Sequence, residues 1–178
     1  MINPNEAVAK QFSGYAATPF LWKGALNGLD MYVPELQQKK AQFQGLDMPN
    51  SRLGKRVEEF VLWELQNEVG VRVLRENVQV FDRQTTIGEL DCLLLKGQQA
   101  IHLEMVYKFY LYDPSLGIGL DRWIGPNRND SLVQKLSKLK ERQLPLLCKP
   151  PTQPVLQNCG LVAENILQQV FFKACIFR

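Results

Sequence analysis

The chain has 178 residues, which is enough for one domain of ordinary size, and 46% of them are hydrophobic, so a sizeable core can form. Its net charge of +3 permits a nucleic-acid partner but does not by itself argue for one. No apolar run approaches the roughly 18 residues that span a bilayer, and the N-terminus lacks a basic region followed by an apolar run. We therefore expect a cytoplasmic protein with no membrane segment. Four scattered cysteines without a Cys-x-x-Cys pair, together with one histidine, argue against structural zinc.

Two regions are predicted from the change in composition along the chain. Residues 1–50 are interrupted by Pro19, Pro34 and Pro49, which indicates an N-terminal segment of short helices and loops packed on the core. The remainder, residues 51–178, carries longer periodic stretches and is predicted to form an α/β core.

The first half of the core reads as one helix and three strands. Helical periodicity covers residues 52–67, and strand-like runs cover 71–82, 87–95 and 100–112. The turn at 96–99 is so short that the second and third strands are expected to form an antiparallel hairpin.

A second helix and a last strand complete the predicted core. Asp130 can cap a helix that runs to about Gln143, and after a proline-rich loop the segment 170–178 can supply a last strand. The order helix, three strands, helix, strand predicts an α/β sandwich around a small mixed sheet that is flanked by helices.

Ionisable residues interrupt the apolar strands, and burying them is costly unless they are paired or hold an ion. Glu89 and Asp91 share one face of their strand, and His102, Glu104 and Lys108 share one face of the next. The hairpin can therefore bring Asp91 close to Glu104.

The helix over 52–67 can add a third acid, since Glu58 falls within the arc of its apolar residues. Three carboxylates on one face raise one another's pKa unless a cation is present. Glu58, Asp91 and Glu104 are therefore predicted to bind Mg²⁺ or Mn²⁺. With Lys108 nearby, such a site could hydrolyse a phosphodiester, because the metal activates water and the lysine can stabilise developing negative charge.

These residues resemble the PD-(D/E)XK nuclease-like superfamily, in which a helix bears an acid, a strand an aspartate and a later strand the sequence Glu-x-Lys. Here Glu58, Asp91 and Glu104 match the acids, whereas Val106 stands at the lysine position and Lys108 lies two residues further on. Five blocks in order resemble more narrowly an uncharacterised bacterial family placed within that superfamily: LGKRVEEFVLWEL, TIGELDCLLL, HLEMVYKFYLY, WIGPNRND and KLSKLKERQL.

The resemblance implies a restriction-endonuclease-like core and a Mg²⁺-dependent nuclease, with DNA expected as the substrate ahead of RNA. It implies catalytic roles for Glu58, Asp91, Glu104 and Lys108. The narrower resemblance ends near residue 144, so the part of the chain from about 145 is expected to be divergent or truncated. Many domains of this kind act as dimers, and a homodimer is compatible with this reading.

Further residues are candidates for contacts around such a site. Lys135, Lys138 and Arg142 fall within a sector of about 60° on the second helix and could contact phosphates, as could Arg128 in the preceding loop. A solvated helix face and a structured turn are the alternatives.

Three residues are candidates for supporting roles. Gln143 falls on the apolar side of its helix, so its amide must find partners and could support the site. His102 could carry a proton or be a hydrogen-bonded core residue, and Glu89 could be a fourth acid or a paired surface residue.

Two rival interpretations stay open from the sequence. The displaced lysine also fits a catalytically inactive nucleic-acid-binding or protein-interaction module on the same fold. Alternatively, the acids and Lys108 could form a purely structural charge network.

Overall fold

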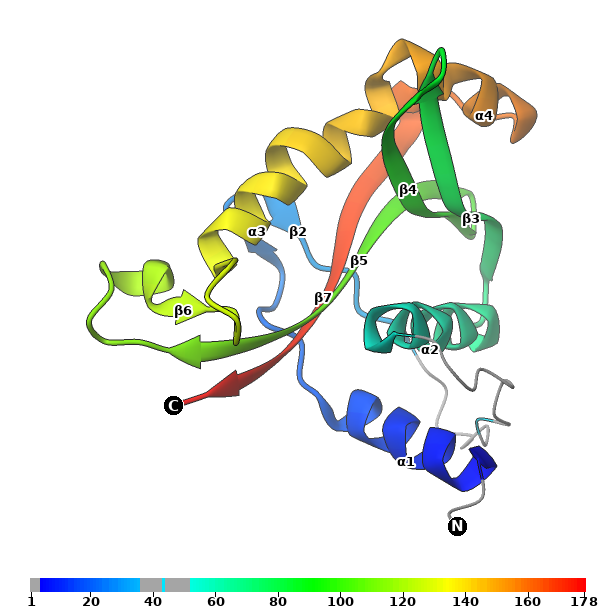
Figure 1. Ribbon diagram of the computed structural model, residues 1–178. Coiled ribbons are helices and arrows are strands. Elements are labelled where there is room, and N and C mark those ends of the chain that lie inside the picture. Colours follow the sequence, from blue (N-terminus) through cyan, green and yellow to red (C-terminus); the bar gives the residue numbers. More distant parts are fainter. Residues whose placement is uncertain (1–3, 36–42, 44–51) are drawn as a thin grey trace.

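The computed structural model describes residues 4–35, 43 and 52–178 (Figure 1). The parts of the predicted N-terminal segment at 1–3, 36–42 and 44–50, together with residue 51 of the predicted core, lie outside the described residues. The α-helices are α1 (Pro4–Ala17), α2 (Leu53–Asn67), α3 (Leu132–Lys138) and α4 (Gln153–Asn158). The strands are β1 (Ala25–Leu26), β2 (Leu29–Asp30), β3 (Val71–Asp82), β4 (Thr85–Lys96), β5 (Gln99–Tyr112), β6 (Trp123–Ile124) and β7 (Ile166–Phe177). Short 3-10 helices cover Gly119–Arg122, Leu144–Cys148, Pro150–Thr152 and Ala163–Asn165, and a π-helix covers Leu139–Gln143.

The main sheet contains five strands and is mixed, as predicted. β3, β4 and β5 are antiparallel neighbours, β6 pairs with the end of β5, and β7 runs parallel to β5. The predicted hairpin is confirmed, with Lys96 opposite Gln99 and Gly97 at a φ of 60° that suits glycine in the turn. The predicted order of one helix, three strands, one helix and one strand is present as α2, β3, β4, β5, α3 and β7, but the structure adds strand β6, helix α4 and the 3-10 and π segments between them.

The pairing between β4 and β5 is short, and this creates the opening for a site. It extends only from Lys96 opposite Gln99 to Cys92 opposite Leu103. Beyond Cys92, β4 continues along β3 alone, while β5 continues along β7. The two central strands therefore separate just where Asp91 and Glu104 lie.

Helical segments cover both faces of the sheet. Figure 1 shows α2 on one side of β5 and β7 and α3 on the other. On the α2 side, Phe60, Val61 and Leu65 pack with residues of β5 and β7, including Leu103 and Phe171. On the α3 side the core contains Val106, Tyr110, Leu136, Leu139 and Phe172. No described helix is long and apolar enough to cross a membrane.

The start of α3 differs from the prediction that Asp130 caps it. Ser131 is the N-cap: its side chain accepts a hydrogen bond from the Gln134 backbone, and the Gln134 side chain accepts one from the Ser131 backbone. This reciprocal pair satisfies two backbone donors at the helix start, so no second cap is needed. The Asp130 carboxylate instead pairs with Lys108.

Candidate functional site

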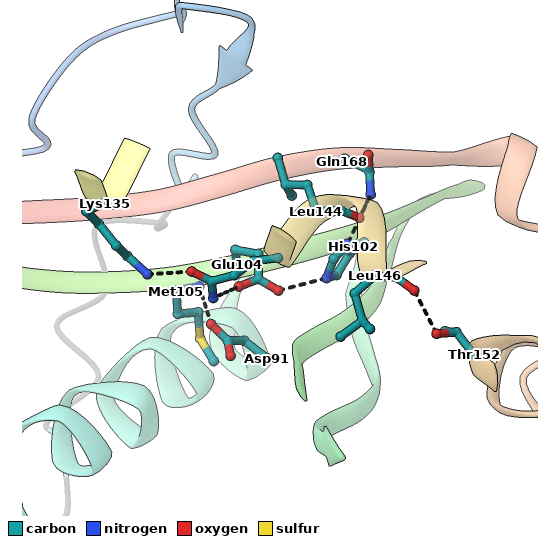
Figure 2. A network of polar contacts seen from close by, with 10 residues as sticks. Asp91, His102, Glu104, Met105, Lys135, Leu144, Leu146, Thr152 and Gln168 are labelled. Carbon is teal, nitrogen blue, oxygen red and sulfur yellow. Dashed lines mark hydrogen bonds and ion pairs between the residues drawn. The ribbon is translucent and has the colours of Figure 1, made fainter. Parts of the chain in front are cut away.

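Glu104 is the centre of a buried polar network on the α3 side of the sheet (Figure 2). Its side chain is 0% exposed, and its Oε1 lies 3.0 Å from Nε2 of the equally buried His102. Its Oε2 accepts a hydrogen bond of 2.5 Å from Nε2 of Gln143. Both carboxylate oxygens are therefore held by donors, which offsets the cost of burying the group.

The hydrogen bonds assign the tautomer of His102. Nε2 of Gln168 donates to the backbone oxygen of Leu144 at 2.5 Å and faces Nδ1 of His102 at 3.3 Å. Because an amide nitrogen can only donate, Nδ1 is the acceptor and Nε2 carries the proton. His102 is thus a core histidine whose Nε2 donates to Glu104.

Asp91 lies at the point where β4 leaves β5. Its Oδ2 accepts a 2.8 Å hydrogen bond from the backbone N–H of Met105, in place of the strand partner that β4 no longer provides. Burial raises the pKa of Asp91 to about 7, and the negative charge of Glu104 adds to this rise, while the bond from Met105 opposes it. Two carboxylates are thus held close enough to disfavour the ionisation of one.

Lys135 reaches the same network from α3. Its Nζ donates to Oε1 of Gln143 at 2.7 Å, so that Gln143 links the amine of Lys135 to Glu104. Gln143 therefore has the partners that its place on the apolar face demands. Burial lowers the pKa of Lys135 to about 8, although the negative charges of Glu104 and Asp91 oppose that change.

A pocket of about 170 Å³ opens beside this network. It is lined by residues of α2, β5 and α3: Gly54, Val57, Glu58, Met105, Val106, Tyr107, Lys108 and Lys135. The structure thus brings together Glu58, Lys108 and Lys135, which are far apart in the sequence. Glu58 forms an ion pair of 3.1 Å with Lys55 on its own helix.

Lys108 is held by Asp130, the residue that was expected to cap α3. Its Nζ lies 2.6 Å from Oδ2 of Asp130, and both side chains are a little over one third exposed. No local pattern predicts this pair, because the two residues are 22 positions apart and meet only through the fold of the loop after β5.

The remaining candidates lie outside the network. Lys138 and Arg142 are exposed, and Arg128 pairs with Asp113 at 3.1 Å. Glu89 faces Gln79 of β3, and no hydrogen bond or ion pair among the described residues joins it to Asp91 or Glu104. Only Lys135 of the predicted basic stripe turns inward, and the helix changes to a π-helix four residues later.

Two of the three predicted carboxylate ligands, Asp91 and Glu104, are placed where they could bind Mg²⁺. Within the described ranges, no three histidine, cysteine or acidic side chains lie close enough to hold a metal ion, so Glu58 does not complete the predicted cluster. Asp91 and Glu104 remain as two neighbouring carboxylates, and Mg²⁺ is often bound by one or two carboxylates with waters and substrate phosphates. The raised pKa of Asp91 reflects a repulsion that a cation would relieve.

Comparison with known proteins identifies the family of the chain. The model of the family described as "Domain of unknown function (DUF1853)" matches residues 4–178, and the chain belongs to this family. The matched range includes both the N-terminal segment and the residues after 144. No curated protein and no solved structure matches the chain.

Proposed function

We propose that this protein is a metal-dependent nuclease of the PD-(D/E)XK type that hydrolyses phosphodiester bonds in DNA. The observation that carries the proposal is the meeting of Asp91 and Glu104 where β4 and β5 separate, beside a pocket that also presents Glu58 and two lysines. In this proposal the mixed sheet flanked by helices is a restriction-endonuclease-like core.

Asp91 and Glu104 would hold Mg²⁺ or Mn²⁺. When bound, the metal would polarise a phosphate oxygen and lower the pKa of a bound water. His102 and Gln143 fix the carboxylate of Glu104 through one hydrogen bond to each oxygen. The Met105 backbone fixes Asp91 in the same way. The acids are therefore oriented before any ligand binds, which reduces the reorganisation needed during reaction.

The exposed basic residues on α3, on the π-helix that follows it and in the loop before it would contact the nucleic-acid backbone. Lys138 and Arg142 are exposed to solvent, and Arg128 lies in the loop that precedes α3. Neutralising phosphates releases counterions, so binding should weaken steeply as salt rises.

The direct test is a cleavage assay with purified protein on single- and double-stranded DNA and RNA, in Mg²⁺, in Mn²⁺ and in EDTA. Asp91→Asn, purified in parallel, is the control for contaminating nucleases, because it keeps an oxygen that can accept from Met105. We expect metal-dependent cleavage that the variant lacks. Failure of the wild type to cut any of these substrates, in either metal, would overturn the proposal.

One observation favours a second candidate, a non-catalytic nucleic-acid-binding module. Lys108 is engaged by Asp130, and Val106 fills the usual lysine position. This candidate predicts salt-sensitive binding of DNA, without cleavage, that Asp91→Asn leaves unchanged.

A further inference from the structure

The lysine position of the motif is used for packing in this protein. Val106 is 4% exposed and belongs to the same core cluster as Leu136 of α3. Val106 is the next side chain after Glu104 on the same face of β5, and α3 covers it. On that helix, Lys135 is the neighbour of Leu136. The fold thus brings an amine from α3 to the neighbourhood where the motif would place one from β5.

Lys108 is less well placed to replace the missing lysine. It lies four residues beyond Glu104 on β5, a separation of about 13 Å along an extended strand. Its amine is also engaged by Asp130 at 2.6 Å. To reach back toward Glu104, Lys108 would have to give up this ion pair.

Lys135 already lies within the network. It lines the pocket together with Glu58 and Lys108, and its Nζ is connected to Glu104 through Gln143 alone. Figure 2 shows its side chain extending from α3 toward Glu104. The charges that act on its amine are those of Glu104, Asp91, Lys138 and Lys108.

We propose that the amine of Lys135, rather than that of Lys108, contacts the scissile phosphate in this pocket. The inference rests on the proposed nuclease function. In the reaction a water oxygen bonds to phosphorus, and the bond to the leaving oxygen breaks with its electron pair remaining on that oxygen. The attacking water loses a proton to solvent and the leaving oxygen gains one, which gives a phosphate monoester and an alcohol. The ammonium group of Lys135 donates hydrogen bonds to the phosphate oxygens, where negative charge grows.

The test compares Lys135→Met with the matched variant Lys108→Met, using a 5′-fluorescent DNA oligonucleotide that the wild type cuts. We expect Lys135→Met to lower kcat by about 100-fold, the size of effect typical of losing one donor to a developing charge. Lys108→Met should lower kcat by about fivefold at most, as for a partly exposed ion pair. DNA affinity, measured by fluorescence anisotropy in EDTA, should change little in either variant. If Lys135→Met does not fold, Lys135→Gln takes its place, since its amide can still donate to Gln143.

A second readout does not depend on cleavage. Removing the positive charge beside Asp91 and Glu104 should tighten Mn²⁺ binding severalfold in Lys135→Met, measured by calorimetry, and leave it unchanged in Lys108→Met. Unchanged Mn²⁺ affinity in Lys135→Met would overturn the placement of the amine beside these acids.

The outcomes separate the two proposals. If the wild type cuts and Asp91→Asn does not, but Lys135→Met keeps the wild-type kcat or Lys108→Met loses as much, only the assignment of Lys135 fails. If the wild type cuts nothing in either metal, the nuclease function fails and the role of Lys135 in the reaction fails with it.

Discussion

At the scale of single residues, the most consequential feature is a carboxylate with no exposure to solvent. Glu104 is stable there because His102 and Gln143 each donate to one of its oxygens. A buried acceptor that loses its donor keeps the full cost of desolvation, whereas removing both partners together costs much less. The His102–Glu104 pair can therefore be examined by removing one or both members.

His102→Leu should lower the free energy of unfolding by about 2–3 kcal/mol, because it removes a hydrogen bond to a charged acceptor inside the core. The double variant His102→Leu/Glu104→Leu should recover part of this loss, since no buried charge is left without a donor. Urea denaturation of the wild type, the double variant and the two single variants His102→Leu and Glu104→Leu measures the difference. A double variant that loses as much as the sum of its two single changes would contradict this account.

The raised pKa of Asp91 has a consequence for stability. Folding raises this pKa from 3.8 to about 7, so the folded protein holds a proton that the unfolded chain has released. The contribution of Asp91 to stability is therefore fully present below about pH 4 and is lost as the pH rises toward 7. One such group changes the free energy of unfolding by at most about 1.4 kcal/mol per pH unit.

In EDTA, Asp91→Asn should remove this part of the pH dependence and be more stable than the wild type at pH 8. Its amide stays neutral and can still accept from Met105. Saturating Mn²⁺ should raise the melting temperature of the wild type and leave that of the variant unchanged. Thermal melts from pH 4 to pH 8, with and without Mn²⁺, provide the measurement. A wild type that stays more stable than the variant at pH 8 in EDTA would refute the assignment.

At the scale of elements, α3 decides whether Lys135 reaches the site. The helix has only seven residues and begins with the reciprocal hydrogen bonds of Ser131 and Gln134. A helix of this length is marginal by itself, so its cap and its packing through Leu132 and Leu136 hold it in place.

Ser131→Ala should lower the free energy of unfolding by about 1 kcal/mol, because it leaves the Gln134 backbone N–H without its acceptor. Ser137→Ala, on the same helix but away from its start, is the matched control and should have little effect. Chemical denaturation of both variants measures the difference. Equal losses in the two variants would show that the cap contributes nothing specific.

The elements differ in how far local sequence determines them. The strands over 71–82, 87–95 and 100–112 and the turn between the last two could be predicted, because alternation and turn residues act over a few positions. The change of α3 into a π-helix at Leu139 could not be predicted, because no local pattern specifies it, and neither could the hydrogen bond that Gln143 at its end donates to Glu104.

The site likewise contains features that the local sequence predicts and features that it does not. The approach of Asp91 to Glu104 follows from the hairpin between β4 and β5, which alternation and the short turn predict. The inward turn of Lys135 and the pairing of Lys108 with Asp130 depend on the path of the loop between β5 and α3, which no local pattern specifies. Tertiary packing of distant segments decided both.

At the scale of the whole molecule, the N-terminal segment completes the sheet. The N-terminal segment pairs with the outer edge of β7. The backbone N–H of Leu21 donates to the backbone oxygen of Phe172, and that of Tyr32 donates to the backbone oxygen of Val170, both at 3.0 Å. An uncovered edge offers unpaired backbone groups to other chains, so this cover also protects the sheet from association.

A chain that begins at residue 52 should therefore not fold into a stable monomer. It would lose Tyr15, Leu29 and Tyr32, all of which are buried in the core. Each fully buried side chain of this size contributes about 1.5–3 kcal/mol, and the sum approaches the 5–15 kcal/mol by which a whole domain is stable. Circular dichroism, thermal melting and size-exclusion chromatography, with the full chain as reference, provide the measurement, and we expect a non-cooperative melt and aggregation. A cooperative transition of a monomer near the melting temperature of the full chain would mean that residues 52–178 are an independent core and that the N-terminal segment is an accessory to it.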